Sequence, residues 1–511
     1  MKEKISDQDT SNHPTTDIIK KGSVITIITL ISRPLGYVRE AIQAYLFGAT
    51  LLVDAFVVAF NFPELIQTLF FSGATSAFLI PVCTKYMKND KEYSDIYSTF
   101  INLTIIFTLF LSIIFFIFSN QIIQLIAPGF SPESKNITGI LFIIMIPVIA
   151  LHAILSVIKA FLNAKEHFAG PEMSGILWNI IFILTAILLN KKLGIYSLAM
   201  GVTLGSISQI IVQFPYLKKF NIRYSIVLSL NHPSITEAKR LFTGALIATS
   251  IVPINSFVGR IIASYLPQGE VASLAYAFRI FILPFSLFAV PVYTVMFSKI
   301  SKLYHEKDME GIYSHIDSSF ILLCITLIPS TILLCSTGDS IIKILYERGA
   351  FTSKETFMTN RALFGYGIGI LFYALSLSLV RVFNALHNMK TPAVIGITSI
   401  VINAILASLL MKQFNNLGIS LATSIVSLYN FSMLYIFLKK KIKYRMTRNT
   451  MRQITKSLLS GIILLLSIYA VRCFWHDRAY LTLSLSIIMT IIVYYIFFRD
   501  YYMMLIPKKR Q

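Results

Sequence analysis

Seven basic side chains lie inside stretches of the sequence that are otherwise apolar. They are Arg33, Arg39, Lys159, Arg260, Arg279, Arg361 and Arg381. An ionised side chain near the bilayer centre costs roughly 2.5–3.5 kcal/mol on insertion scales, so it is usually retained only where it faces a watery cavity or a partner. Guanidinium groups hold phosphate oxygens through paired, charge-assisted hydrogen bonds. The excess of arginine therefore indicates a cavity for a phosphate-bearing substrate more than one for a cationic compound.

The segment 32–40, which reads SRPLGYVRE, holds the most informative of these charges. Arg33 and Glu40 are seven residues apart, so they lie on nearly the same face of a helix, and Arg39 begins a second polar stripe. Pro34 removes a helix hydrogen bond beside Gly36, which predicts a bend. The pattern fits either a structural Arg–Glu pair or a cationic patch that lines a cavity.

The charges in the second half of the chain have more than one interpretation. Arg260 and Arg279 could face the arginines of segment 32–40 across a central cleft. Arg361 lies near the outer end of its apolar stretch, where a long side chain can reach water. Lys159 and Arg381 lie near the cytoplasmic ends of theirs, where the same explanation applies.

Asp54 opens the second apolar stretch. A carboxylate at that position either caps the start of its own helix or pairs with a cavity arginine from the outer side. Both interpretations remain open.

The elements that position these residues are predicted to be transmembrane helices. Hydrophobic residues make up 55% of the 511 and charged residues 14%, whereas a soluble domain has about 25% charged residues. The apolar stretches are long enough to cross a hydrocarbon core of about 30 Å as helices. We therefore predict an all-α, polytopic membrane protein of about fourteen spans, at 23–47, 53–72, 97–118, 137–162, 171–189, 194–216, 241–265, 271–297, 316–335, 359–386, 392–411, 417–438, 457–474 and 480–498.

The distribution of basic residues predicts the orientation. An even number of spans places both termini on one side, and the segments on that side hold about three times as many Lys and Arg as the opposite loops, which indicates the cytoplasm. Attraction to an anionic leaflet accounts for the net charge of +21, so no nucleic-acid partner is expected. The most basic loop, 439–456, could dock a partner protein, and a scaffold role remains an alternative.

An internal repeat organises the spans. Asn163 is followed eight residues later by Pro171, and Asn384 is followed eight residues later by Pro392. Six spans and six further spans in the same orientation form a parallel repeat, the plan of transporters with two lobes around a central site. The predicted domains are a cytoplasmic tail at 1–22, an N-terminal lobe at 23–219, a C-terminal lobe at 220–441, and a basic loop, two extra helices and a cytoplasmic C-terminus at 442–511.

Motifs for catalysis are missing from the sequence. It contains no HExxH, no GxSxG and no glycine-rich loop ending in GK[ST]. Its four cysteines are scattered without metal-type spacing. We therefore expect neither an enzyme nor a bound metal or cofactor.

Several segments resemble the MurJ (MviN) family of lipid II flippases, and the resemblance covers nearly the whole chain. The segments are 32–40 (SRPLGYVRE), 47–49 (FGA), 54–60 (DAFVVAF), 72–82 (SGATSAFLIPV), 127–130 (APGF) and 359–363 (TNRAL). The resemblance implies the fold of the multidrug/oligosaccharidyl-lipid/polysaccharide flippase superfamily in a bacterial inner membrane. It also implies movement of lipid II, the undecaprenyl-diphosphate-linked peptidoglycan precursor, to the outer leaflet by alternating access. The implied partners are lipid II, membrane lipids and possible cell-wall synthesis proteins at loop 439–456.

The resemblance also assigns site residues. By motif match, the positions in or near a cationic cavity are Arg33, Arg39, Glu40, Asp54, Arg279 and Arg361, with Asn163 as a polar residue at the end of the fourth span. Arg260 joins them on its charge alone. The match does not extend to Gln67, where many relatives carry a base, or to Phe278, where many carry an acid. The eleventh and twelfth spans hold Asn403 but no acid, so the sodium site of some relatives is not expected.

Two other transport functions remain open. One is a flippase for another undecaprenyl-diphosphate glycan, such as an O-antigen unit, and the N-terminal motifs argue against it. The other is a cation-coupled exporter of small molecules, and the excess of arginine argues against that.

Overall fold

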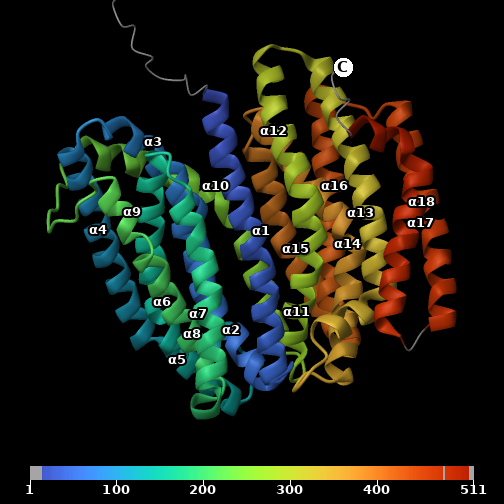
Figure 1. The fold of residues 1–511 in the computed structure, drawn as a ribbon, viewed down its shortest axis with the longest axis horizontal. Helices are drawn as coiled ribbons and strands as arrows, with labels where there is room; N and C mark the ends of the chain where they lie inside the picture. Colours follow the sequence, from blue (N-terminus) through green and yellow to red (C-terminus); the bar gives the residue numbers. More distant parts are fainter. Residues whose placement is uncertain (1–13, 476–477, 506–511) are drawn as a thin grey trace, which may run out of the picture. The chain divides into compact units, whose positions relative to one another are not determined.

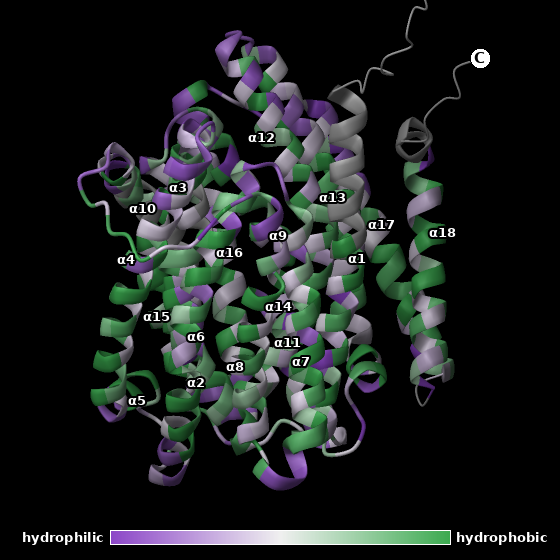
Figure 2. Ribbon diagram, turned by 60° about the vertical axis from the view of Figure 1, so that its left-hand side comes forward, coloured by the Kyte–Doolittle hydropathy of each residue, from purple (hydrophilic) through white to green (hydrophobic). Residues whose placement is uncertain are grey.

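The chain folds almost entirely into helices. The structure is a computed structural model that describes residues 14–475 and 478–505. Within these ranges it contains eighteen α-helices, two short π-helical segments and no strand. Figure 2 shows that the helices are mostly hydrophobic along their length, while hydrophilic residues gather at their ends and in loops. The predicted all-α membrane fold is confirmed. Helices suit a membrane because they satisfy their own backbone hydrogen bonds in lipid.

The helices of the first half follow the predicted spans closely. They are α1 (Pro14–Phe47), α2 (Leu51–Ile66), the π-helical η1 (Gln67–Ser72), α3 (Gly73–Tyr86), α4 (Asp90–Ile117), α5 (Ser119–Ile126), α6 (Pro132–Ala164), α7 (Ala169–Leu193), α8 (Tyr196–Ile211) and α9 (Phe214–Lys219). Helix α1 already begins within the predicted tail 1–22, and the rest of that tail, residues 1–13, lies outside the described residues.

The second half follows the same order with two exceptions and adds two helices. Its elements are α10 (Pro233–Ala263), α11 (Glu270–Pro284), the π-helical η2 (Phe285–Ala289), α12 (Val290–His305), α13 (Met309–Leu345), α14 (Ser353–Ala385), α15 (Lys390–Phe414), α16 (Asn416–Ile442), α17 (Arg448–Trp475) and α18 (Ala479–Leu505). Here α13 replaces the pair α4 and α5, and α16 replaces the pair α8 and α9. Twelve helical stretches in the described ranges are long and apolar enough to cross a membrane. The remaining two predicted spans fall on α1 and α10, which carry Arg33, Arg39 and Arg260.

The repeat is visible in the helix bounds. Helices α6 and α14 cover residues 132–164 and 353–385, so both their ends differ by 221. The stretches 51–86 and 270–305 differ by 219 at both ends, and each contains a π-helical segment. A π-helical segment within a long helical stretch therefore recurs at a matching place in each half.

Turns recur at matching places as well. Backbone φ is positive at Gly48 and Gly269, at Glu166 and His387, at Gly194 and Asn415, and at Asn221 and Lys443. Left-handed backbone is uncommon for residues other than glycine. Its recurrence at paired turns indicates that the two halves share a backbone path as well as a pattern of hydropathy.

Side chains cap the start of some of the helices. Asn89 accepts hydrogen bonds from the backbone nitrogens of Lys91 (3.1 Å) and Glu92 (3.3 Å) at the start of α4. Asp308 accepts one from the Gly311 nitrogen at 2.8 Å at the start of α13. Such side chains satisfy amide groups that have no partner within their own helix.

The chain divides into two compact units, which we describe separately. The first contains residues up to 42, 66–117 and 144–246, and the second contains 43–65, 118–143 and the chain from 247 onward. Residues 220–246 thus belong to the first unit, although the sequence assigned them to the C-terminal lobe. The lobe boundaries at 219 and 441 remain predictions.

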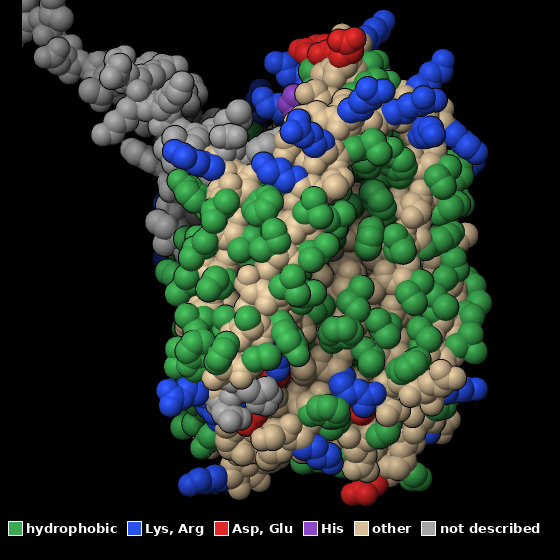
Figure 3. All heavy atoms as spheres, turned by 90° about the vertical axis from the view of Figure 1, so that its right-hand side faces the viewer, with side chains coloured by type: hydrophobic (Ala, Val, Ile, Leu, Met, Phe, Trp, Pro, Cys, Tyr) green, Lys and Arg blue, Asp and Glu red, His purple; other side chains and the backbone are tan. Residues whose placement is uncertain are grey.

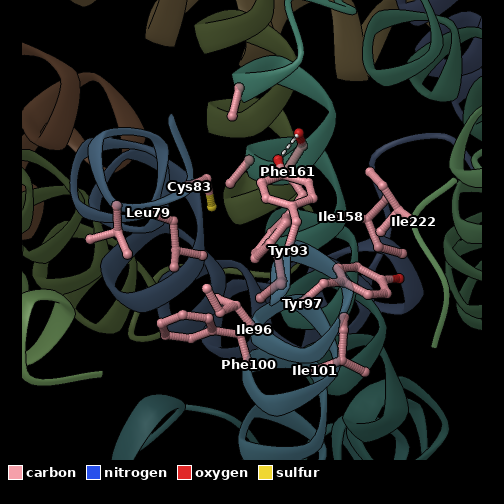
Figure 4. Close-up of a cluster of buried hydrophobic side chains, with 14 of the residues drawn as sticks. Leu79, Cys83, Tyr93, Ile96, Tyr97, Phe100, Ile101, Ile158, Phe161 and Ile222 are labelled. Carbon is pink, nitrogen blue, oxygen red and sulfur yellow. Dashed lines mark hydrogen bonds between the residues drawn. The ribbon is translucent and has the colours of Figure 1, made fainter. Parts of the chain in front are cut away.

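Aromatic side chains form the core of the first unit. Figure 4 shows Tyr93, Tyr97 and Phe100 of α4 around Phe161 of α6, with Cys83 of α3 nearby. The Tyr93 hydroxyl donates a hydrogen bond to the Phe161 carbonyl at 2.8 Å, and the two rings lie 5.0 Å apart between centroids. This bond satisfies a polar group that is otherwise buried among apolar side chains.

In the second unit, the two additional helices pack on α13. Ile321 and Ile325 of α13 contact Leu464 and Ile468 of α17 and Tyr494 of α18. Figure 1 shows α17 and α18 side by side. Figure 3 shows a face with hydrophobic side chains over its middle and Lys and Arg gathered toward both ends. That distribution is typical of a surface that faces lipid.

Candidate substrate-binding site

Arg39 on α1 occupies the best-defined cationic site. Its guanidinium group donates a hydrogen bond to the Glu40 carboxylate, and the side chains of the pair are only 13% and 12% exposed. The guanidinium carbon lies 4.7 Å from the ring centroid of Trp178 and 5.5 Å from that of Phe182. Cation–π contacts of this kind strengthen when the cation is desolvated. The first unit therefore holds a cation whose orientation is fixed before any substrate arrives.

The two rings under Arg39 are positioned by the close approach of α7 and α8. A Cβ atom added at Gly205 would lie 2.9 Å from Trp178 Cδ1, and one added at Gly201 would lie 3.3 Å from Phe182 Cα. These glycines, four residues apart on α8, leave room for the two rings of α7. The buried Trp178 Nε1 atom has no hydrogen-bond partner among the described residues.

Arg260 in the second unit is already paired. It lies on α10 and forms an ion pair with Glu64 of α2, with 2.7 Å between Nη1 and Oε2. The same guanidinium group donates to Asn61, one turn before Glu64 on α2. Both partners of the ion pair are about one-third exposed, so the pair contributes little stability. Its charge is balanced within the second unit.

Asp54 caps a helix other than its own. Its two carboxylate oxygens accept hydrogen bonds from the backbone nitrogens of Gly269 at 2.5 Å and Ala272 at 2.7 Å, in the first turn of α11. The residue is only 3% exposed. A carboxylate at a helix N-terminus satisfies free amides and is favoured by the helix dipole. Asp54 therefore has a structural role at the start of α11, and its predicted contact with substrate stays a prediction.

Arg361 has a comparable role at the opposite end of a helix. Its Nη2 atom donates to the carbonyl of Phe414, the last residue of α15, at 2.7 Å. A cation at a helix C-terminus binds carbonyls that have no partner within the helix. This contact accounts for Arg361 without a substrate.

The substrate contacts of all eight predicted site residues stay predictions, those of Arg33, Arg279 and Asn163 among them. Arg33 on α1 and Arg279 on α11 are exposed. Asn163 lies at the end of α6, and its buried Oδ1 atom has no hydrogen-bond partner within the described chain. Of the predicted residues, the structure brings together Arg39 and Glu40.

Sequence analysis missed the aromatic contacts of Arg39 and the partners of Arg260. Trp178 is one of only two tryptophans in the chain, and it lies in a predicted span. The small residues Gly201 and Gly205 recur at helical spacing in the next span. Together these features could have indicated that the two spans pack closely around a large aromatic side chain.

Two repeats of six helices, with an ordered cation inside the apolar part of one of them, define the class of membrane transporters built from two lobes. A solved inward-facing transporter of the multidrug resistance MATE family, within the MOP superfamily, has the same fold at 12% identity, with a TM-score of 0.68 over 82% of this chain and 98% of that one. Residues 43–494 match the family described as "Lipid II flippase MurJ". The chain belongs to that family.

Individual relatives match along most of their length. A "Probable lipid II flippase MurJ" of Aquifex aeolicus is 30% identical over 443 residues, which cover 85% of this chain and 86% of the relative. The "Lipid II flippase MurJ" of Thermosipho africanus is 29% identical over 491 residues, covering 96% and 98%. A solved structure titled "Lipid II flippase MurJ, inward closed conformation" has 29% identity and a TM-score of 0.82, covering 94% and 99%.

Proposed function

We propose that this chain moves lipid II from the cytoplasmic to the outer leaflet of a bacterial inner membrane. The observation that carries the proposal is the extent of the family match, since residues 43–494 run through both repeats and into α18. The ordered Arg39 supports a phosphate-bearing head group, because guanidinium groups bind phosphate oxygens in pairs. The protein is thus a transporter and not an enzyme.

In the mechanism we propose, Arg39 receives the diphosphate. Its guanidinium carbon lies 4.7 Å from the Trp178 ring centroid and 5.5 Å from the Phe182 ring centroid, and these contacts favour one position of the cation. Glu40 balances the charge until the substrate enters. The Trp178 N–H group can donate to a diphosphate or sugar oxygen, and Arg33 supplies further positive charge in the same unit.

Transport then proceeds by alternating access of the two predicted lobes. With both termini in the cytoplasm, as the distribution of basic residues predicts, the membrane potential favours outward movement of a negatively charged head group by about 2.3 kcal/mol per charge per 100 mV. The undecaprenyl tail stays in lipid throughout.

Complementation tests the proposed function directly. The chain is expressed in a strain depleted of its own lipid II flippase, and lipid II exposed at the outer leaflet is measured. We expect growth to be rescued and outer-leaflet lipid II to return. Failure by a well-expressed, membrane-inserted chain would contradict the lipid II assignment and favour a related lipid-linked glycan.

Trp178 provides a graded test of the site. We expect Trp178→Ala to lower lipid II flipping by roughly 2- to 30-fold, since a cation–π contact contributes about 0.5–2 kcal/mol. Trp178→Phe keeps a ring beneath Arg39 and should retain more activity than the alanine variant. Outer-leaflet lipid II is measured at matched expression. Equal activity of wild type and Trp178→Ala would show that the Trp178 ring is not part of the substrate-binding site.

Loop 439–456 has an ordered centre that supports the prediction of a docking surface. Tyr444 is fully buried, and its hydroxyl donates a hydrogen bond to Asp317 of α13. The Thr447 nitrogen donates to the same carboxylate at 3.3 Å. The basic side chains exposed around this anchor are Lys439, Lys440, Lys441, Lys443, Arg445, Arg448 and Arg452. A cell-wall synthesis protein as the partner remains a prediction.

A further inference from the structure

The segment between the two repeats, residues 222–230, contains no helix or strand and lies against α4. Figure 1 shows it as the green trace beside α4. It follows α9 and precedes α10, and it belongs to the first unit together with α4, α9 and the first half of α10. We call residues 222–230 the strap.

One polar face of α4 binds the backbone of the strap. Ser94, Ser98, Thr99 and Asn102 fall on that face by helical spacing. The hydroxyl oxygens of the first three accept hydrogen bonds from backbone nitrogens of the strap. Ser94 accepts from Arg223 (3.2 Å), Ser98 from Ser225 (3.0 Å) and Thr99 from Ser229 (3.2 Å).

Asn102 binds the carbonyl groups of the strap. Its Nδ2 atom donates to Ser225 at 3.3 Å and to Val227 at 2.9 Å, and its Oδ1 atom accepts a hydrogen bond from the Tyr224 hydroxyl at 2.8 Å. Irregular backbone at membrane depth is tolerated only where protein satisfies its polar groups. The polar face of α4 meets that requirement for much of the strap.

The opposite edge of the strap is apolar and exposed. Three alternate residues are well exposed: Ile226 is 93% exposed, Leu228 45% and Leu230 51%. Ser225, Val227 and Ser229 lie between or beside them, are less exposed and bond to α4 through their backbone. A row of three apolar side chains exposed on a fixed backbone needs an apolar environment.

The position of the row on α4 identifies that environment. Helix α4 is one of the candidate membrane spans. Asn102 lies twelve residues after Asp90, so it is about 18 Å along the helix at 1.5 Å per residue. A few residues further on, α4 exposes its own apolar side chains, including Ile106, Leu109 and Phe110. The apolar row is thus continuous with a surface that faces lipid.

We propose that the strap is embedded in the lipid leaflet on the side of the termini, with Ile226, Leu228 and Leu230 among the upper parts of the acyl chains. Interfacial segments insert their apolar faces about 5–10 Å into this region. The strap anchors the connection between the repeats at a fixed depth. This proposal does not depend on which substrate is carried.

Fluorescence quenching in proteoliposomes tests the proposal. Ile226→Cys is labelled with an environment-sensitive fluorophore in a background that carries Cys335→Ser and Cys473→Ser, since the remaining native cysteines are buried. Ile488→Cys, at an exposed apolar position on α18, is the lipid-facing control, and Lys91→Cys, at an exposed position near the start of α4, is the water-facing control. Quenchers attached to lipid chains are compared with aqueous iodide.

We expect the label at 226 to behave like the label at 488, with strong quenching by lipid-attached groups and weak quenching by iodide. Quenching by iodide as strong as at position 91 would overturn the proposal. Weak quenching by both reagents would also overturn it, because the row would then be covered by protein.

A second variant tests the role of α4. Asn102→Ala removes three hydrogen bonds to the strap, and we expect iodide quenching at position 226 to rise severalfold. Thr108→Val is the matched control on the same helix, because the Thr108 hydroxyl bonds only to carbonyls of α4 itself. An unchanged quenching pattern in properly folded Asn102→Ala would show that these bonds do not hold the strap.

Discussion

Arg39→Ala is expected to abolish the rescue of a strain depleted of its lipid II flippase. The substitution removes the cation that Trp178 and Phe182 hold in position, and with it the paired hydrogen bonds available to the diphosphate. Hydrogen bonds to charged groups contribute about 1.5–3 kcal/mol each, which corresponds to a loss of roughly 10- to 100-fold in flipping for one such bond. Arg39→Lys retains the charge without the planar guanidinium group, so its flipping activity should lie between that of wild type and that of Arg39→Ala.

The control for Arg39→Ala is an arginine outside the repeats. Arg472 at the end of α17 pairs with Asp339, with 2.7 Å between nitrogen and oxygen, and Arg472→Ala should rescue growth. Membrane levels of each variant and outer-leaflet lipid II are measured in parallel. Full rescue by well-expressed Arg39→Ala would exclude Arg39 as a substrate contact and leave the family assignment intact.

Gly269→Ala is expected to cause the largest loss of stability. Gly269 has φ of +84°, which costs residues with a side chain about 1–2 kcal/mol. An added Cβ atom would also lie 2.2 Å from the carbonyl oxygen of Ala49, and that oxygen belongs to backbone that cannot rotate away. The total should exceed about 3 kcal/mol, which places the variant among unusually severe substitutions.

Thermal unfolding in detergent measures this effect. Gly139→Ala is the matched control, since a Cβ atom at Gly139 in α6 would meet nothing within 4 Å. That change should be neutral or slightly stabilising, because alanine is favoured over glycine inside helices by about 1 kcal/mol. Equal unfolding midpoints for Gly269→Ala and wild type would contradict the close approach of the two backbones.

The fold could be predicted from the sequence because its main signals are local. A stretch of apolar residues long enough to cross lipid must form a helix, whatever its neighbours are. The repeat was visible in pairs such as Asn163 with Pro171 and Asn384 with Pro392. The helix bounds show the repeat more clearly. Matching helices of the two halves are 219 residues apart in sequence before loops 127–131 and 346–352, and α6 and α14, which follow these loops, are 221 apart. The second loop is two residues longer than the first, which accounts for the change.

The candidate site was harder to predict because its charges are satisfied by distant residues. Asp54 reads as a cap for its own helix or a partner for an arginine, yet it binds Gly269, 215 residues away. Arg361 binds the end of α15. Sequence alone shows that a buried charge needs a partner, but it does not show whether that partner is protein or substrate. Arg39 differs because its contacts with Trp178 and Phe182 lie close to it in the fold, within the first unit.

The buried cap at Asp54 has a consequence for the speed of transport. It joins α2, from the first repeat, to α11, from the second, through two amides inside one compact unit. Any cycle that separates these two helices must first withdraw a carboxylate from both amides. Each 1.4 kcal/mol of that cost slows the step about tenfold. Asp54 would therefore slow any movement that separates α2 from α11.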